Sequence, residues 1–147
     1  MNKPDASATA HAGVVVVTHV DYGASLLRAA ESILGPLQDC SSIQVDAAVD
    51  SAETVKRLQD AAMLLDHGQG VIILTDMFGG TPTNLSLSLL NTHAVEVVTG
   101  VNLPMLLKVF ENRIKLGLRE LAMLAMDAGC KGIVSAGDML RKKAQAD

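Results

Sequence analysis

An aspartate and a histidine each follow an apolar, β-branched run of this chain, and together they could do nucleophilic or acid–base chemistry. Asp76 comes shortly after residues 70–74, and His19 directly follows residues 13–18. Short apolar runs of this kind are typical of strands buried on both faces. Ligands bind outside the carboxyl ends of such strands where the strand order reverses, so the two side chains become neighbours if their strands flank that reversal. A carboxylate bonded to one ring nitrogen would fix the tautomer and leave the other nitrogen free as a nucleophile or base.

Residues 75–84, TDMFGGTPTN, surround the aspartate with groups that suit an anion. Thr81 and Pro82 are typical of a helix start, and Gly79 and Gly80 come just before it. Glycines let the backbone approach a ligand closely, and a helix N-terminus aims free N–H groups at negative charge. The segment therefore predicts an anion site, with threonine hydroxyls as further donors.

Each of these residues also has a purely structural interpretation. Asp76 could cap the following turn, and Gly79-Gly80 could simply make a tight strand-to-helix connection. Phe78 could be core, or, on a loop in a chain with 2% aromatic residues, a docking contact for a partner. Asn102, on a third loop at the same sheet edge, could be a turn residue or part of the pocket. Of the other histidines, we expect His11 to lie in a tail and His67 at a helix end. We expect His93 to be structural, between a helix and a strand.

Composition excludes several classes of protein. The 147 residues suit one domain, and 49% hydrophobic content excludes a disordered chain. The net charge of −4, with scattered Lys and Arg, makes nucleic acid an unfavourable partner. Cys40 and Cys130 are isolated, as expected of thiols in a reducing cytosol, so a zinc site is not indicated. We expect no bound metal.

The chain shows no targeting or membrane-spanning pattern. The first dozen residues are small and polar, without the apolar core of a secretion signal, and no apolar run approaches membrane-spanning length. We therefore expect a cytoplasmic protein that does not insert directly into a membrane.

Strand-like and helix-like segments alternate, which predicts an α/β fold whose mainly parallel sheet carries helices on both faces. The predicted strands are residues 13–18, 42–47, 70–74 and 94–99, and the predicted helices are residues 23–34, residues 51 to about 67, and segments starting at Thr81 and Pro104, with another at 116–126. A last strand candidate, residues 132–136, lacks a long crossover and could add antiparallel to an edge or pair with another subunit.

At these residues the chain resembles the enzyme IIA domain of the mannose family of the bacterial phosphoenolpyruvate-dependent sugar phosphotransferase system (PTS). The resemblance runs from about Gly13 to Ala136. It is carried by Val17-Thr18-His19, by Leu26-Leu27-Arg28-Ala29-Ala30-Glu31, by Asp76 to Asn84, and by Gly100-Val101-Asn102-Leu103-Pro104-Met105-Leu106.

The resemblance implies a phosphotransferase that acts as a phosphohistidine carrier. His19 would accept a phosphoryl group from the carrier protein HPr and pass it to a IIB component, with Asp76 as the partner that orients the ring. No cofactor is required, because the phosphoryl group arrives already activated on another protein. Family members form homodimers that exchange a C-terminal strand, which would give residues 133–136 that role. The phosphoryl-binding candidates are Thr18, Thr75, Gly80, Thr81, Thr83 and Asn102.

One position departs from the family pattern. The family usually has glycine directly after the histidine, whereas Val20, Asp21 and Tyr22 intervene here before Gly23. A left-handed backbone after His19 would be disfavoured by the β-branched Val20, and Asp21 adds negative charge near an incoming phosphoryl group.

The expected architecture is thus one flavodoxin-like domain, residues 13–137, with strand order 2-1-3-4 plus the C-terminal antiparallel edge strand. Residues 1–12 are predicted to be a disordered tail and residues 138–147 a polar tail. Two alternatives to the carrier stay open: a regulatory module that senses phosphorylation without sugar transport, and a receiver-like domain phosphorylated on Asp76. A receiver needs an acidic pair after the first strand to hold Mg²⁺, and here His19 stands with only Asp21 nearby.

Overall fold

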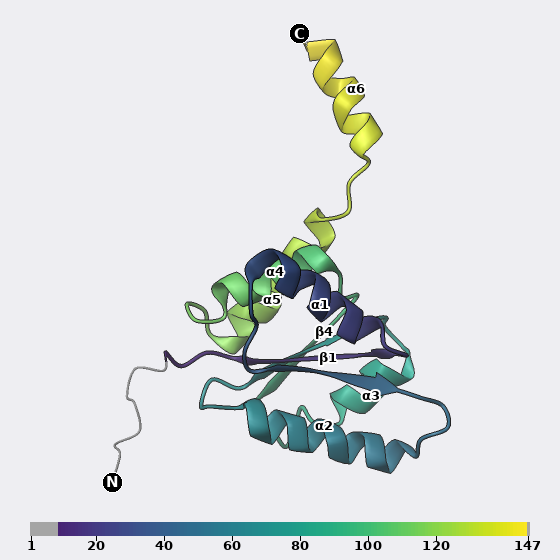
Figure 1. The fold of residues 1–147 in the computed structure, drawn as a ribbon, viewed down its shortest axis with the longest axis vertical. Coiled ribbons are helices and arrows are strands. Elements are labelled where there is room, and N and C mark those ends of the chain that lie inside the picture. The colour runs from purple at the N-terminus through teal and green to yellow at the C-terminus, as the bar shows by residue number, and fades with distance from the viewer. Residues whose placement is uncertain (1–8, 147) are drawn as a thin grey trace.

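Four parallel strands form the sheet in the predicted order, β2-β1-β3-β4. The computed structural model describes residues 9–146 (Figure 1). The strand order reverses between β1 and β3, so the carboxyl ends of these two strands lie side by side, as the sequence predicted. The strands are β1 (Gly13–His19), β2 (Cys40–Val45), β3 (Val71–Thr75) and β4 (Val95–Thr99).

Helices cover both faces of this sheet. Helices α1, α4 and α5 pack on one face, and α2 and α3 pack on the other (Figure 1). The helices are α1 (Tyr22–Leu34), α2 (Ser51–Leu65), α3 (Thr81–Leu87), α4 (Leu103–Asn112), α5 (Leu118–Lys131) and α6 (Ala136–Ala146). No helix among the described residues is long and apolar enough to cross a membrane.

The alternating side chains of β1 divide the apolar core into two layers. Val14 and Val16 join the layer beneath α1, α4 and α5, whereas Val15 and Val17 join the layer beneath α2 and α3. Because both faces are covered, every β1 residue before His19 is buried. The strand is thereby fixed up to the residue that carries the candidate chemistry.

The amino end of the domain is packed slightly before the predicted boundary. Residues 1–8 of the predicted N-terminal tail lie outside the described residues. Ala12 is buried in the core, and the His11 ring lies 2.7 Å from a carboxylate oxygen of Asp39.

The predicted edge strand at residues 132–136 does not form in the single chain. Gly132 ends α5, residues 133–135 form an irregular link, and α6 then extends away from the body of the domain (Figure 1). Ile133 and Val134 are 78% and 60% exposed, so their apolar side chains have no core to enter. The predicted polar tail, residues 138–147, lies within α6 as far as residue 146.

Candidate active site

His19 and Asp76 meet at the carboxyl edge of the sheet. The ring Nδ1 of His19 lies 2.6 Å from Asp76 Oδ2, and the backbone N–H of His19 donates to the same oxygen at 2.8 Å. The His19 side chain is half exposed, whereas that of Asp76 is 13% exposed. The two residues, 57 positions apart, are thus neighbours as the sequence predicted, and they are joined by two hydrogen bonds.

The hydrogen bonds to Asp76 settle which ring nitrogen of His19 is protonated. Burial raises the pKa of the Asp76 carboxyl, but hydrogen bonds from the His19 backbone, the His19 ring and the Met77 N–H lower it more, so the net pKa lies below its ordinary value. An ionised carboxylate only accepts hydrogen bonds, so Nδ1 of the ring must donate. In the neutral ring the proton therefore sits on Nδ1, and Nε2 carries the free lone pair.

The loop after β3 is held by a short series of hydrogen bonds. The Met77 N–H donates to Asp76 Oδ1 at 2.9 Å, and the Thr83 hydroxyl donates to the Met77 carbonyl at 2.7 Å. Thr75 Oγ1 lies 2.6 Å from Thr83 Oγ1. Both threonines, which were predicted to bind the phosphoryl group, are buried, and their hydroxyls face each other inside the loop.

Gly80 lets the loop come close to the histidine. A Cβ atom at this position would lie 3.2 Å from Cε1 of His19 and 3.2 Å from Cγ of Met77. The backbone of Gly80 therefore lies against the edge of the ring between its two nitrogens, as expected of a glycine that allows close approach.

Val20 adopts the left-handed conformation that the sequence predicted to be disfavoured. Its φ is +45°, and its side chain is 61% exposed beside His19. The turn is fixed by Thr18, whose hydroxyl accepts a hydrogen bond from the Gly23 N–H at 2.8 Å and donates to the Val20 carbonyl at 3.4 Å. This places a β-branched residue in a backbone region that costs roughly 1–2 kcal/mol for an L-residue.

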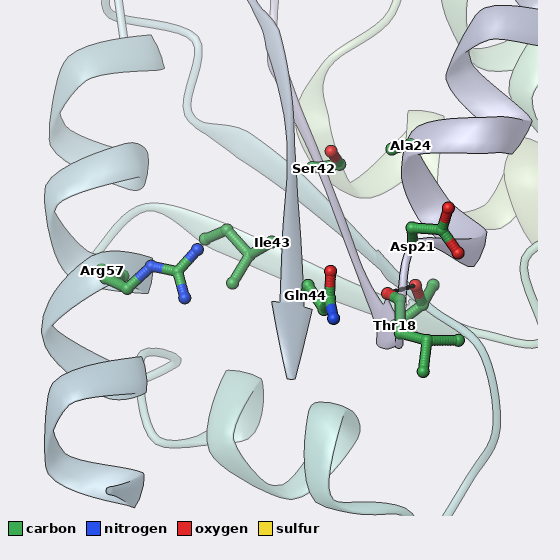
Figure 2. A pocket seen from close by; sticks show the side chains of 8 residues that line it. Thr18, Asp21, Ala24, Ser42, Ile43, Gln44 and Arg57 are labelled. Carbon is green, nitrogen blue, oxygen red and sulfur yellow. Dashed lines mark hydrogen bonds between the residues drawn. The ribbon is translucent and has the colours of Figure 1, made fainter. Parts of the chain in front are cut away.

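Thr18, a predicted phosphoryl-binding residue, therefore uses its hydroxyl to hold this turn. Its side chain is 1% exposed, and it lines a 240 Å³ hollow over the outer edge of β2 (Figure 2). Figure 2 shows Asp21 on the α1 side of this hollow and Arg57 on the α2 side, with Gln44 of β2 between them. His19 is not among the residues that line it.

His19 instead opens onto a pocket of 330 Å³ between the β2–α2 loop and α3. Thr81, a predicted phosphoryl-binding residue, lines this pocket together with Leu85. The other side of the pocket is lined by residues that were not predicted from the sequence, among them Asp46, Ser51 and Thr54. The position of these residues just after the second strand was the signal that could have identified them, because that strand also ends at the catalytic edge.

Asn102, a predicted phosphoryl-binding residue, is not among the residues that line this pocket. Its Oδ1 accepts from the Met105 N–H at 3.0 Å, and its Nδ2 donates to the Gly129 carbonyl at 3.0 Å. It therefore caps α4 and ties α4 to α5, which is the structural alternative for this residue.

Phe78 projects from the same loop as Asp76. It is 80% exposed, and its neighbour Met77 is 56% exposed. Because the phenyl ring is excluded from the core, the structural alternative of a core residue is wrong, and an exposed aromatic side chain remains two residues after Asp76. Among the described residues, no three acidic, histidine or cysteine side chains are grouped to hold a metal ion.

Known proteins resemble the chain in sequence and in fold. Residues 13–126 match the family described as the PTS system fructose IIA component. The mannose-specific EIIAB component of the PTS from Escherichia coli K12 is 30% identical over 122 residues, which are 82% of this chain but 38% of that protein. The chain thus spans well under half the length of that relative.

Solved structures of PTS IIA components share the fold of this chain over most of their length. The EIIA component from Streptococcus agalactiae superposes with a TM-score of 0.77 at 25% identity, covering 86% of this chain and 98% of that one. The PTS IIA protein associated with the fucose utilisation operon of Streptococcus pneumoniae gives a TM-score of 0.75 at 27% identity, covering 89% and 97%. Together with the sequence match, these likenesses show that the chain belongs to the mannose and fructose family of PTS IIA components.

Proposed function

We propose that this protein is a phosphocarrier that accepts a phosphoryl group from HPr on Nε2 of His19 and passes it to a IIB component. The observation that carries this proposal is the pairing of His19 Nδ1 with Asp76 Oδ2 at 2.6 Å. With Nδ1 engaged, Nε2 is the nucleophilic atom of the ring. The family membership supports the same chemistry.

The transfer needs no cofactor, because the phosphoryl group arrives already activated on a histidine of the donor protein. The lone pair of Nε2 forms a bond to phosphorus while the donor's P–N bond breaks, and that electron pair returns to the donor ring. The proton on Nδ1 stays in place, and Asp76 stabilises the resulting positive ring. The reverse exchange hands the group to IIB.

Positioning and neutralisation of the phosphoryl oxygens supply most of the catalysis in such a transfer. The first backbone N–H groups of α3 have no acceptor within the helix, and Thr81 adds a hydroxyl at the rim of the pocket that His19 lines. Gly80 keeps this helix start within reach of the ring edge. We therefore assign Thr81 and the Gly80 backbone to phosphoryl binding, and Thr75 and Thr83 to holding the loop.

A regulatory module is the second candidate, and the conformation of Val20 favours it. An exposed valine at φ +45° stands where a partner protein would approach the reactive ring. Such a protein would accept phosphate from HPr but would pass it on slowly. The rate of phosphoryl transfer to IIB separates the two candidates, because a carrier transfers the group rapidly and a sensor does not.

The receiver alternative has less support. Asp76 accepts hydrogen bonds on both carboxylate oxygens, one from Met77 and two from His19. Its oxygens are therefore engaged in orienting the ring, whereas a phosphoacceptor carboxylate must present a free oxygen to phosphorus.

We also propose that the protein is a homodimer held by its C-terminal segment. The outer edge of β4 borders a 330 Å³ groove whose lining includes Met123 and Met126, which are 63% and 58% exposed. The link between α5 and α6 exposes Ile133 and Val134. Light scattering should give twice the chain mass for the full chain and the single chain mass after truncation at Gly132; a full-length monomer would contradict the dimer.

The carrier function is tested by incubating the protein with phosphoenolpyruvate, enzyme I and HPr and recording its intact mass. Wild type should gain one phosphoryl group that is stable to alkali, and His19→Ala should gain none. An unchanged wild-type mass would refute the carrier. An adduct that persists in His19→Ala but disappears in Asp76→Asn would instead establish the receiver.

A further inference from the structure

Two buried threonines flank the loop that carries Asp76. Thr75 is the last residue of β3 and is 0% exposed, and Thr83 lies in the first turn of α3 and is 2% exposed. Their hydroxyl oxygens are 2.6 Å apart. The pair therefore joins the two elements that flank the Asp76 loop.

The single hydrogen of each hydroxyl group determines which threonine donates to the other. The Thr83 hydroxyl has one hydrogen, which it donates to the Met77 carbonyl at 2.7 Å, so the Thr75 hydroxyl must donate to Thr83. The backbone N–H of Met77 donates to Asp76 Oδ1 at 2.9 Å. A continuous series of hydrogen bonds thus runs from Thr75 through Thr83 and Met77 to the carboxylate that binds the ring.

The Met77 carbonyl depends on Thr83 for its orientation. Its only other hydrogen bond among the described residues comes from the Gly80 N–H at 3.4 Å, which is long for an N–H donor. Without the Thr83 hydroxyl, the peptides on either side of Met77 can rotate. Rotation would move the N–H that holds Asp76 Oδ1.

We propose that Thr83, supported by Thr75, is a positioning residue that fixes Asp76 and, through it, the His19 ring. This inference rests on the proposed phosphocarrier function for its catalytic consequence, but its structural part concerns the unphosphorylated protein. Thr83 touches neither the ring nor the phosphoryl group and acts through Met77 and Asp76.

The test compares substitutions that separate positioning from stability. Thr83→Val keeps the shape of the side chain but removes the hydroxyl, leaving the buried Thr75 hydroxyl without its acceptor. Thr75→Val/Thr83→Val removes both hydroxyls, so no buried donor is left unpaired and stability should recover. Thr83→Ser keeps the hydroxyl. Ser86→Ala is the matched control, because Ser86 carries a buried hydroxyl of the same helix, and this hydroxyl donates to the Pro82 carbonyl at 2.7 Å.

The first readout is nitrogen NMR of the His19 ring in the unphosphorylated protein, which reports the tautomer and the Nδ1–H hydrogen bond. Wild type, Thr83→Ser and Ser86→Ala should show one tautomer with a strongly downfield Nδ1 proton. Thr83→Val and the double variant should both show mixed tautomers. An unchanged ring spectrum in the double variant would overturn the proposal, whether or not the protein carries phosphate.

The second readout is the single-turnover rate of phosphoryl transfer from phosphorylated HPr, measured beside urea unfolding. We expect the rate to fall about tenfold or more in Thr83→Val and to stay low in the double variant even though its stability returns, because misplacement of about 1 Å can cost 100-fold in rate. A rate that recovers with stability would show that the pair is merely structural. If wild type accepts no phosphate at all, the carrier function fails and the NMR result still decides the positioning role.

Discussion

Oδ2 of Asp76 accepts both the backbone N–H and the ring Nδ1–H of His19, at 2.8 and 2.6 Å. One oxygen therefore fixes the main chain and the side chain of the same residue. The hydrogen bond from the backbone N–H holds the last residue of β1 in place. The hydrogen bond from the ring fixes which nitrogen of that residue carries the proton. This arrangement explains how a half-exposed histidine can be held in one orientation before a partner arrives.

The charge of Asp76 should matter for transfer as much as its geometry. Asp76→Asn retains an oxygen that can accept from Nδ1 but removes the charge that stabilises the phosphorylated ring. We expect the single-turnover transfer rate to fall by about 100-fold, with the fold kept by circular dichroism. Asp60→Asn, an exposed carboxylate on α2, serves as the control and should transfer at the wild-type rate. A wild-type rate in Asp76→Asn would contradict the proposed role of the charge.

Val20→Gly should stabilise the protein, since glycine adopts φ +45° without steric strain. Relief of that strain exceeds the extra backbone entropy of glycine in the unfolded chain, so we expect the free energy of unfolding to rise by about 0.5–1 kcal/mol. Urea unfolding measures it. Val20→Ala retains a Cβ and should show no comparable gain; equal effects of the two substitutions would show that the left-handed turn is not strained.

Phe78→Ala should weaken docking without weakening the fold, because the side chain is 80% exposed. We expect KM for phosphorylated HPr to rise about tenfold with kcat nearly unchanged, as for an exposed aromatic anchor in an interface. Ile114→Ala, an apolar residue 54% exposed near the opposite edge of the sheet, is the control. If Phe78→Ala leaves KM unchanged, the docking role is wrong.

Arg113 should stabilise the domain from the amino edge of the sheet. It is 8% exposed, donates to the carbonyls of Ala12, Gln38 and Asp39, and lies 4.8 Å from the Phe110 ring centroid. Arg113→Met removes the guanidinium donor from the Ala12 and Gln38 carbonyls, whereas the Asp39 carbonyl keeps a hydrogen bond from the Val14 N–H. We expect a loss of about 2–3 kcal/mol in the free energy of unfolding. Arg119→Met, at an exposed position on α5, should cost much less; equal losses would refute this role.

Asp39 should make stability depend on pH in the acid range. Burial raises the pKa of its carboxyl, but hydrogen bonds from His67 and His11 lower it more, so the folded pKa lies below the unfolded one. The unfolded state therefore binds more protons, and the stabilisation is present above pH about 3.9 and lost as pH falls through the folded pKa. Asp39→Asn should differ most from wild type in urea unfolding at pH 7 and least near pH 3. A constant difference would contradict the ionic contribution.

The strand order and the His19–Asp76 pair could be predicted because apolar periodicity and sheet topology determine both. Topology brings the carboxyl ends of β1 and β3 together whatever the details of their loops. Backbone strain at Val20 was also predictable, because the family's glycine indicates a positive φ at that position.

The roles of individual polar residues were less predictable, because they depend on contacts between distant segments. Four of the predicted residues have hydroxyl or amide groups suited to a phosphoryl group, but in the structure each group makes hydrogen bonds within the protein. They are Thr18, Thr75, Thr83 and Asn102. The helix predicted at residues 116–126 continues to Lys131, so Gly129 lies inside α5, where a Cβ would come 2.8 Å from Met105 Cε. The cluster of Asp39 with His11 and His67 could not be predicted, because each histidine is 28 positions from Asp39 in the sequence.

The most direct test of the central claim is to identify which nitrogen of His19 carries phosphate. The protein is labelled with ¹⁵N, phosphorylated by phosphoenolpyruvate, enzyme I and HPr, and examined by nitrogen–phosphorus NMR. Because Asp76 occupies Nδ1, we expect phosphorus coupled to Nε2 and a retained Nδ1–H signal. Phosphate on Nδ1, or no phosphohistidine in the wild-type protein, would contradict the proposed mechanism.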